Sequence, residues 1–411
     1  MSKLAQYLPK INLSILMVLV FVMPIHLRFI PVLIALFGIL NIVDGFVNKT
    51  FSFSHKKIII TGLLFFFIHL ISVFYSDNKA VAWFDIEIKL SLLVFPIIFL
   101  FKNSFIIERK RWVLISFVLG TIVSSIIMLL FAYYRFDGVN SHVFYYAELS
   151  LFHPSYMAMY FIFSILIIIR IMDKDLSKLN HRLIAYSIIL FLLILISLLQ
   201  SKAGILSIIA ISFYYIVFAF IRSKALMLRI SFFVLAVSVS LIFVQKNNRL
   251  QTMANAVEKI SDEGRTSGST GIRFSMWKVT IQEIPKYWIF GVGSGDIKEV
   301  LFKRYEEEGL TEAIEGNYNV HNQYLETFFG QGIIGISLLL LLLFFGIQEA
   351  LKKKELILSG YIILITLSMG PESMLNSQMG VVFISFFYYF LFVFDIPNDE
   401  KNSIYKKLDD K

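Results

Sequence analysis

Long runs of apolar residues, separated by short polar connections, make up most of the chain. The runs are rich in Ile, Leu and Phe and do not alternate with polar residues, so they predict helices and not strands. Most have about the length that crosses the hydrocarbon core of a bilayer at roughly 1.5 Å per residue. We predict an all-α, polytopic membrane protein with about twelve spans. Their bounds lie near 11–27, 29–47, 57–75, 88–101, 112–134, 150–171, 182–199, 201–221, 228–245, 331–351, 355–371 and 377–396.

One polar stretch interrupts this pattern, and it divides the chain into four parts. We predict an N-terminal transmembrane bundle of about nine helices (1–245), a large loop with short helices (246–330), C-terminal transmembrane helices (331–396) and a polar tail (397–411). Within the loop, the pattern predicts an amphipathic helix over 249–262, a flexible link over 266–271 and helices over 272–284 and 296–308. Another helix is predicted to start near Asn319 and lead into the next span.

Composition and charge agree with a membrane protein and give it an orientation. The 411 residues are 57% hydrophobic with a mean hydropathy of +0.75, too apolar for a soluble domain. The net charge of +9 is spread over many connections, which argues against nucleic acid as a partner. Between the predicted spans, 23 Lys and Arg lie on one side and 5 in the short connections on the other. We therefore expect both termini in the cytoplasm and the 246–330 loop outside.

Two features limit the chemistry that is open to the chain. It has no cysteine, which excludes disulfides, thiolate nucleophiles and thiolate metal ligands. No residue spacing suggests a metal site, so we expect none.

The first span follows Lys3 and Lys10 without a small-residue cleavage site, so we expect it to be retained as an anchor.

His321 is the candidate catalytic residue of the loop. It lies in a polar, aromatic stretch just before a predicted span, and histidine is suited to proton transfer near neutral pH. The adjacent Asn322, or Glu326 five residues on, could orient the ring. The competing interpretation is an interfacial histidine that caps a helix or bonds a carbonyl group.

Two basic residues are candidates for binding an anionic substrate. Arg273 lies one helical turn before Trp277, and its planar guanidinium suits two hydrogen bonds to phosphate oxygens. Lys202 lies at a tight turn between two predicted spans, among polar neighbours. The competing interpretations are a solvated loop arginine and a lysine that extends from a helix end to the membrane surface.

Further polar groups lie at the same predicted membrane face. Glu372 is a carboxylate at membrane depth, a costly position that suggests function, with Lys202 or an arginine as partner. His153 opens a predicted span and either faces the same chamber or caps the helix. The segment Gly291–Gly295 is typical of a tight turn, and a phosphate cradle is the less favoured interpretation because no βαβ unit surrounds it.

Together these motifs resemble the O-antigen ligase/O-antigen polymerase (Wzy-type) family. The resemblance rests on the order of short motifs between about residues 200 and 385. They are Ser201-Lys-Ala-Gly204, Arg273-x-x-x-Trp277, Gly291-Val-Gly-Ser-Gly295, His321-Asn-Gln-Tyr-Leu-Glu326, Gly332-Ile-Ile-Gly335, Pro371-Glu-Ser-Met-Leu375 and Gly380-Val-Val-Phe383. Members commonly have arginine where this chain has Lys202, which replaces a two-pronged contact with a point charge.

The resemblance implies a GT-C-like, inverting glycosyltransferase of lipopolysaccharide biosynthesis in the bacterial inner membrane, with its active site on the periplasmic side. The implied donor is a glycan on undecaprenyl pyrophosphate, and the acceptor is the lipid A core or another lipid-linked glycan. Neither a metal, a nucleotide sugar nor another cofactor is implied. On this view His321 is the base, and Arg273 and Lys202 bind the pyrophosphate.

Two alternatives to a ligase remain open. A polysaccharide polymerase would use the same donor, and we favour the ligase because a single long loop with a histidine at its end precedes the last three spans. A flippase or other transporter would need charged groups along a path through the membrane, often in two related halves. The chain has no internal repeat and few charges within spans, which favours chemistry at one face.

Overall fold

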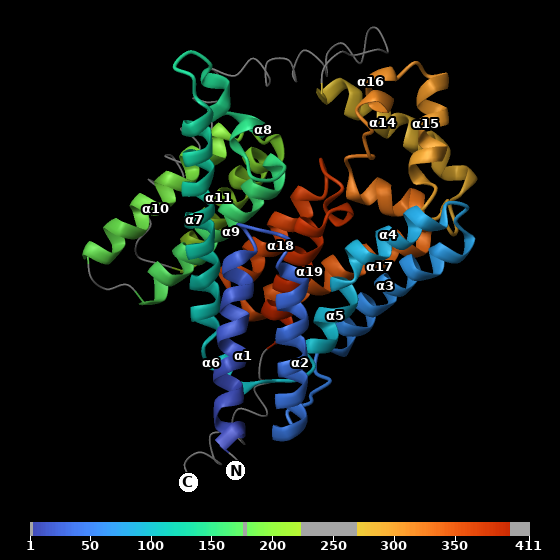
Figure 1. Cartoon of the computed structure of the whole chain (residues 1–411). Coiled ribbons are helices and arrows are strands. Elements are labelled where there is room, and N and C mark those ends of the chain that lie inside the picture. Colours follow the sequence, from blue (N-terminus) through green and yellow to red (C-terminus); the bar gives the residue numbers. More distant parts are fainter. Residues whose placement is uncertain (1–2, 176–178, 223–268, 395–411) are drawn as a thin grey trace.

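The computed structural model describes residues 3–175, 179–222 and 269–394. Within these ranges the regular structure is helical, apart from one isolated antiparallel bridge between Phe51 and Phe101. Long apolar helices pack side by side, and shorter helices cover one end of the molecule (Figure 1). The predicted all-α class is therefore confirmed for the described residues.

The described helices include the long ones expected from the apolar runs and several short ones that the pattern did not predict. The first part of the chain contains α1 (Lys3–Val22), α2 (Ile30–Asn48), α3 (Lys56–Tyr75), α4 (Lys79–Lys89), α5 (Ser91–Ile98), α6 (Ser104–Glu108), α7 (Lys110–Arg135), η1 (Ser141–Phe144), α8 (Tyr146–Leu149), α9 (Pro154–Asp175), α10 (Leu179–Leu198) and α11 (Lys202–Arg222). The last part contains α14 (Ser269–Glu283), η2 (Ile284–Lys286), α15 (Ile297–Glu307), α16 (Thr311–Glu315), α17 (Gln323–Lys353), α18 (Leu356–Ser368), η3 (Met374–Asn376) and α19 (Gln378–Phe392).

Six described helices are long and apolar enough to cross a membrane. They are α2, α3, α7, α9, α10 and α17. Four further apolar segments are shorter, namely Tyr7–Val22, Lys202–Val217, α18 and α19. The predicted span 228–245, the predicted helix 249–262, most of the link 266–271 and the tail lie outside the described residues. These helices have the length and composition of membrane spans, while the count of twelve spans stays a prediction.

The prediction of one continuous span over 88–101 is wrong. The chain forms two helices there, because α4 ends at Lys89 and α5 runs only from Ser91 to Ile98. At Leu90 between them, the backbone N–H bonds the Glu87 carbonyl in a tighter, 3₁₀-like turn. The apolar run here is short, and buried Lys89 at its start pairs with Asp85 on α4. A charge pair at this depth is accommodated by protein contacts and not by lipid.

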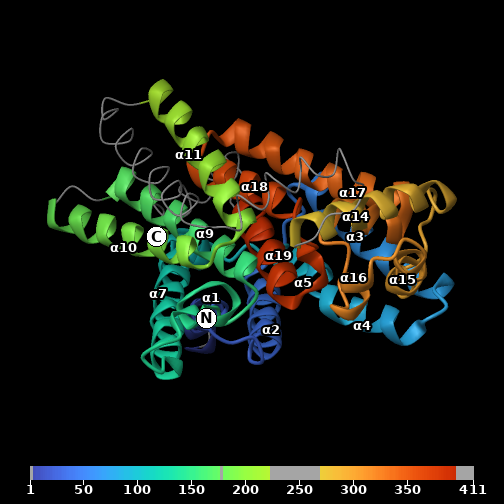
Figure 2. The same ribbon diagram turned by 90° about the horizontal axis from the view of Figure 1, so that it is seen from above.

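The core is built around α9 and α19. Every residue of α19 from Gly380 to Phe392 is buried, as expected for a helix that is hydrophobic on all sides. Its Phe387 contacts Phe163 of α9 and Phe117 of α7, with ring centroids 4.5 and 4.9 Å apart. Seen from above, α9, α18 and α19 lie centrally, with α10 and α17 toward the outside (Figure 2).

The loop helices α14–α16 lie at the end of the molecule opposite to the start of α1 (Figure 1). They join the bundle through α17, which is kinked at Gly332, where φ is +64°. A Cβ at this position would lie 2.1 Å from the Ile289 carbonyl oxygen, so the close approach of the two segments requires glycine. The kink separates a first part of α17 beside the loop helices from a long apolar part.

Candidate functional site

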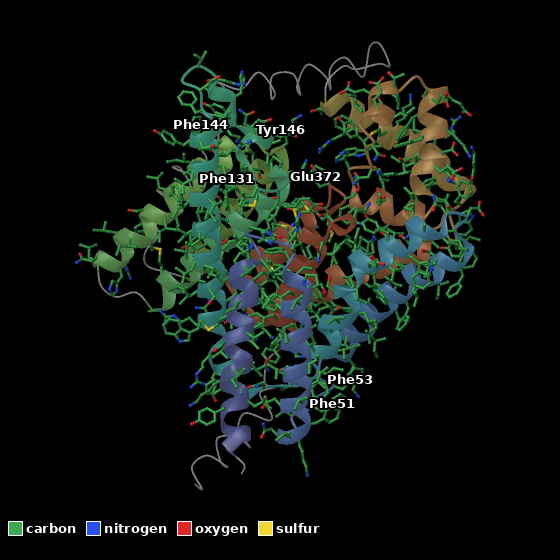
Figure 3. All side chains as sticks on the ribbon, in the orientation of Figure 1. Phe51, Phe53, Phe131, Phe144, Tyr146 and Glu372 are labelled. Carbon is green, nitrogen blue, oxygen red and sulfur yellow. The ribbon has the colours of Figure 1, made fainter. Side chains whose placement is uncertain are left out.

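Glu372 is the centre of a polar cluster where the loop helices meet the bundle. It lies in the connection between α18 and α19, is 5% exposed, and accepts hydrogen bonds from three segments. Arg273 of α14 donates to Oε1 at 2.9 Å, Ser155 of α9 donates to Oε1 at 3.1 Å, and His321 meets Oε2 at 2.9 Å. Figure 3 shows Glu372 between the α8–α9 region and the α14–α16 region.

His321 is held from both its backbone and its ring. Its φ of +51° is unusual for a residue with a side chain, and its backbone N–H donates to Asn319 Oδ1 at 2.9 Å. The ring lies edge-on to that of Tyr318, and its Nδ1 faces the Glu372 carboxylate. A carboxylate at Nδ1 favours the tautomer with the proton on that nitrogen, which leaves a lone pair on Nε2. This arrangement can accept a proton at Nε2.

Arg273 bridges the same carboxylate to the backbone of the loop that carries it. Nη1 donates to the Pro371 carbonyl at 2.6 Å, and Nη2 donates to Glu372. These bonds engage two of the five N–H donors of a guanidinium. The side chain is 23% exposed, so part of its positive charge faces solvent beside the histidine. The arginine predicted as a partner for Glu372 is therefore Arg273.

Hydroxyl groups connect this cluster to the start of α11. Ser201 donates to the hydroxyl of Ser155 at 3.4 Å and also caps α11 by accepting from the Gly204 N–H at 3.1 Å. The next residue, Lys202, donates to Thr270 on α14. Sequence patterns alone do not predict Ser155 or Ser201 as site residues, and the one available signal is a hydroxyl in the first turn of a predicted span beside a candidate histidine or lysine.

Burial and charge act in opposite directions on Glu372. Burial disfavours its ionised form, but the hydrogen bond from His321 and the charge of Arg273 together lower its pKa to about 2. His153 caps the start of α9, where its Nδ1 accepts from the Ser155 N–H at 3.4 Å. Burial lowers the pKa of His153, with the nearby charge of Glu372 opposing. A carboxylate that stays ionised can hold the His321 ring at any physiological pH.

The expectation that Asn322 or Glu326 orients the His321 ring is wrong. Asn322 caps α17, where its Oδ1 accepts from the N–H groups of Tyr324 and Leu325. Buried Glu326 accepts from three other groups at 2.7–3.2 Å: the Val320 N–H, the Ser373 hydroxyl and the Asn376 amide. The side chain of Glu326 therefore ties the residue before His321 to the residue after Glu372. It positions the two reactive segments and does not contact the ring.

The glycine turn at 291–295 does not form a phosphate cradle. Gly291 and Gly293 have positive φ, and each backbone N–H of the turn donates to a protein oxygen. The acceptors are the carbonyls of Tyr287, Phe329 and Gly330 and the hydroxyls of Ser72 and Ser76. Because these donors are engaged, an anion would have to displace structural hydrogen bonds. The tight-turn interpretation fits this geometry.

Outside this cluster, the described residues offer no metal-binding group but do form an open apolar depression. Among the described residues, no group of three or more His, Cys, Asp or Glu side chains is arranged to hold a metal ion.

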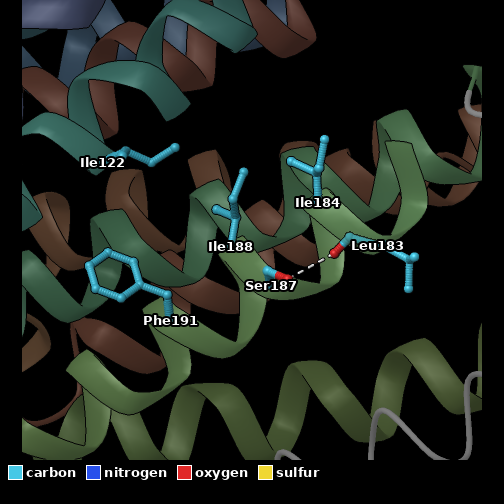
Figure 4. A pocket seen from close by; sticks show the side chains of 6 residues that line it. All are labelled: Ile122, Leu183, Ile184, Ser187, Ile188 and Phe191. Carbon is cyan, nitrogen blue, oxygen red and sulfur yellow. Dashed lines mark hydrogen bonds between the residues drawn. The ribbon is translucent and has the colours of Figure 1, made fainter. Parts of the chain in front are cut away.

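An open depression of about 380 Å³ lies between α7 and α10 (Figure 4). It is lined by Ile122 and α10 side chains, and its one hydroxyl, from Ser187, bonds the Leu183 carbonyl. Such a surface suits hydrocarbon chains and offers no group to orient a polar ligand.

Comparison with known proteins adds two findings. Residues 186–340 match the family model described as O-antigen ligase. This segment contains Lys202, Arg273 and His321, and the match confirms the resemblance drawn from the motifs. A protein of Haemophilus influenzae described as uncharacterised is 22% identical over 340 residues, which cover 80% of this chain and 81% of that protein.

Proposed function

We propose, from the match of residues 186–340 to the O-antigen ligase family model, that the chain transfers a glycan from undecaprenyl pyrophosphate to a lipid A core acceptor. The reaction is placed at the periplasmic face of the bacterial inner membrane. On this proposal His321, Arg273 and Glu372 lie on the periplasmic side of the membrane, which agrees with the side predicted from the distribution of Lys and Arg. The proposal needs a base for the acceptor hydroxyl and positive charge for the leaving pyrophosphate.

The observation that carries the proposal is the contact between His321 and Glu372. With its Nδ1–H directed at the carboxylate, His321 presents Nε2 as the base. Nε2 takes the proton of the acceptor hydroxyl while that oxygen attacks the anomeric carbon. The bond from that carbon to the pyrophosphate oxygen breaks, and its electron pair stays on the pyrophosphate. Attack from the opposite face inverts the anomeric configuration.

Positive charge beside the base serves the leaving group. Arg273 and His321 contact the same carboxylate, that of Glu372, so the guanidinium lies close to the proposed base. We assign it to the pyrophosphate oxygens, whose negative charge grows as the bond breaks. Lys202 contacts Thr270 at the start of the helix that carries Arg273, and we assign it a second contact to the same group. The contacts of Arg273 and Lys202 with the pyrophosphate lower the barrier only if they are stronger in the transition state than in the bound substrate.

Reconstitution of the purified protein tests the proposal. Proteoliposomes receive a lipid-pyrophosphate-linked glycan without added metal, with lipid A core or a second lipid-linked glycan as acceptor. We expect product on lipid A core, and His321→Ala should reduce kcat by about 10²–10⁴-fold. His142→Ala, a change at an exposed histidine of η1, is the matched control and should keep full activity. Lengthened lipid-linked chains would show a polymerase instead, and glycolipid in the opposite leaflet without transfer would show a transporter.

A further inference from the structure

Four consecutive exposed apolar residues protrude from the segment that joins α14 to α15. Tyr287, Trp288, Ile289 and Phe290 are 37%, 53%, 42% and 58% exposed. We call this segment, residues 287–290, the apolar finger. It lies within a polar loop region and is far too short to register as a membrane span. Adjoining large apolar side chains on a surface mark a contact with a partner or a membrane.

Two hydrogen bonds place the finger at the level where the spans meet the membrane surface. The Tyr75 hydroxyl at the end of α3 donates to the Phe290 carbonyl at 2.6 Å. The Ile333 N–H, just after the kink of α17, donates to the Trp288 carbonyl at 2.8 Å. From Ile333 to Lys353, α17 is about 31 Å long at 1.5 Å per residue, close to the roughly 30 Å thickness of the hydrocarbon core. The kink therefore marks one boundary of that core.

The finger continues an apolar surface that belongs to the spans themselves. Phe74 of α3 is 73% exposed, and Ile333 and Ile334 of α17 are 40% and 38% exposed. These residues are next to Tyr75 or the kink, the two points where the finger is hydrogen-bonded. Tyrosine and tryptophan side chains are enriched where a bilayer meets water, because their rings are apolar with one polar group. The composition of the finger matches that environment.

We propose that the apolar finger is inserted into the lipid leaflet on the His321 side of the membrane. Its partner is phospholipid, because the finger adjoins the exposed apolar surface of α3 and α17, two helices long and apolar enough to cross a membrane. The finger is also connected to the candidate site. The residues that follow it, Val292 and Gly293, donate to the carbonyls of Phe329 and Gly330 in the first part of α17. That part begins two residues after His321. The finger thereby sets the height of His321 relative to the membrane surface.

Site-directed spin labelling tests the insertion independently of any enzymatic activity. The chain has no cysteine, so a nitroxide can be attached at Ile289→Cys without removing other thiols. Phe74→Cys, at an exposed apolar position of α3, and Lys303→Cys, at a highly exposed position of α15, are the controls. In liposomes we expect the Ile289 label to collide more with oxygen than with a water-soluble nickel chelate, as at Phe74. The Lys303 label should show the reverse order.

Two outcomes would overturn the insertion. An Ile289 label that collides with the nickel chelate as readily as the Lys303 label lies in water. A label shielded from both reagents is covered by protein, such as a second copy of the chain. A label at Phe290→Cys gives a second reading if the first variant is poorly folded. These readouts do not depend on glycan transfer, so they stand or fall separately from the proposed function.

Discussion

Replacing Glu372 with glutamine isolates the role of one negative charge, because the two side chains have nearly the same shape. In the native cluster one carboxylate oxygen accepts from Arg273 and Ser155, and the other faces His321 Nδ1. A glutamine has only one oxygen, so neither orientation satisfies both sides. With its NH₂ group toward Arg273, two donors face each other. With its NH₂ group toward His321, the ring must carry its proton on Nε2 and can no longer act as the base.

The size of the effect follows from the same contacts. The pKa of Glu372 falls from an ordinary value of 4.5 to about 2. At about 1.4 kcal/mol per unit, the folded protein favours the ionised form by roughly 3 kcal/mol. Because the folded pKa is depressed, this stability is present above about pH 4.5 and is lost as the pH falls toward 2. Loss of an effective base costs about 10²–10⁴-fold in kcat.

Transfer assays in proteoliposomes and thermal unfolding in detergent measure the two quantities. We expect Glu372→Gln to unfold at a lower temperature at neutral pH, and the difference from the parent protein should shrink as the pH falls below 4.5. Glu355→Gln is the matched control, because Glu355 also pairs with an arginine, Arg170, at the other end of α18. A kcat for Glu372→Gln within twofold of the parent value, with Glu355→Gln equally active, would refute the role of the carboxylate.

Three further substitutions test other parts of the site. Arg273→Ala should lower kcat/KM by at least about tenfold and raise the KM for the lipid-linked donor, and an unchanged donor KM would contradict pyrophosphate binding. Trp277→Phe removes the indole N–H bonded to the Val320 carbonyl at 2.9 Å, so kcat should fall with little change in KM. Gly332→Ala forces a Cβ against the Ile289 carbonyl, so we expect clearly lower thermal stability, and a melting temperature equal to that of the parent would count against a rigid kink.

The sequence predicted the helical class and most of the long described helices, because a run of 18 or more apolar residues has few other stable structures. It failed at 88–101, where hydropathy alone does not show that Lys89 pairs with Asp85 within the protein. Pro285 and Gly309 predict where two loop helices end, because proline and glycine terminate helices through local backbone geometry. Such local signals are the ones that a sequence carries directly.

The sequence pointed to the main residues of the candidate site but not to the contacts between them. His321, Arg273 and Glu372 stood out because charged or titratable groups near apolar spans are costly. The sequence suggests Asn322 or Glu326 as the partner of the ring, whereas the carboxylate that contacts it lies 51 residues away in the chain. Two helices, α17 and α18, separate them along the chain, and only their packing brings the two loops together. Sequence spacing holds no record of that packing.

The sharing of Glu372 between Arg273 and His321 has a consequence for the order of events in a turnover. With a neutral histidine, one anion and one cation give the cluster no net charge. On the proposed route, the proton taken from the acceptor leaves the cluster with one positive charge at the moment when the pyrophosphate gains negative charge. The electrostatic attraction between the cluster and the pyrophosphate leaving group then persists until His321 loses that proton. Release of the lipid pyrophosphate is thereby linked to deprotonation, and slowing proton loss to water should slow product release.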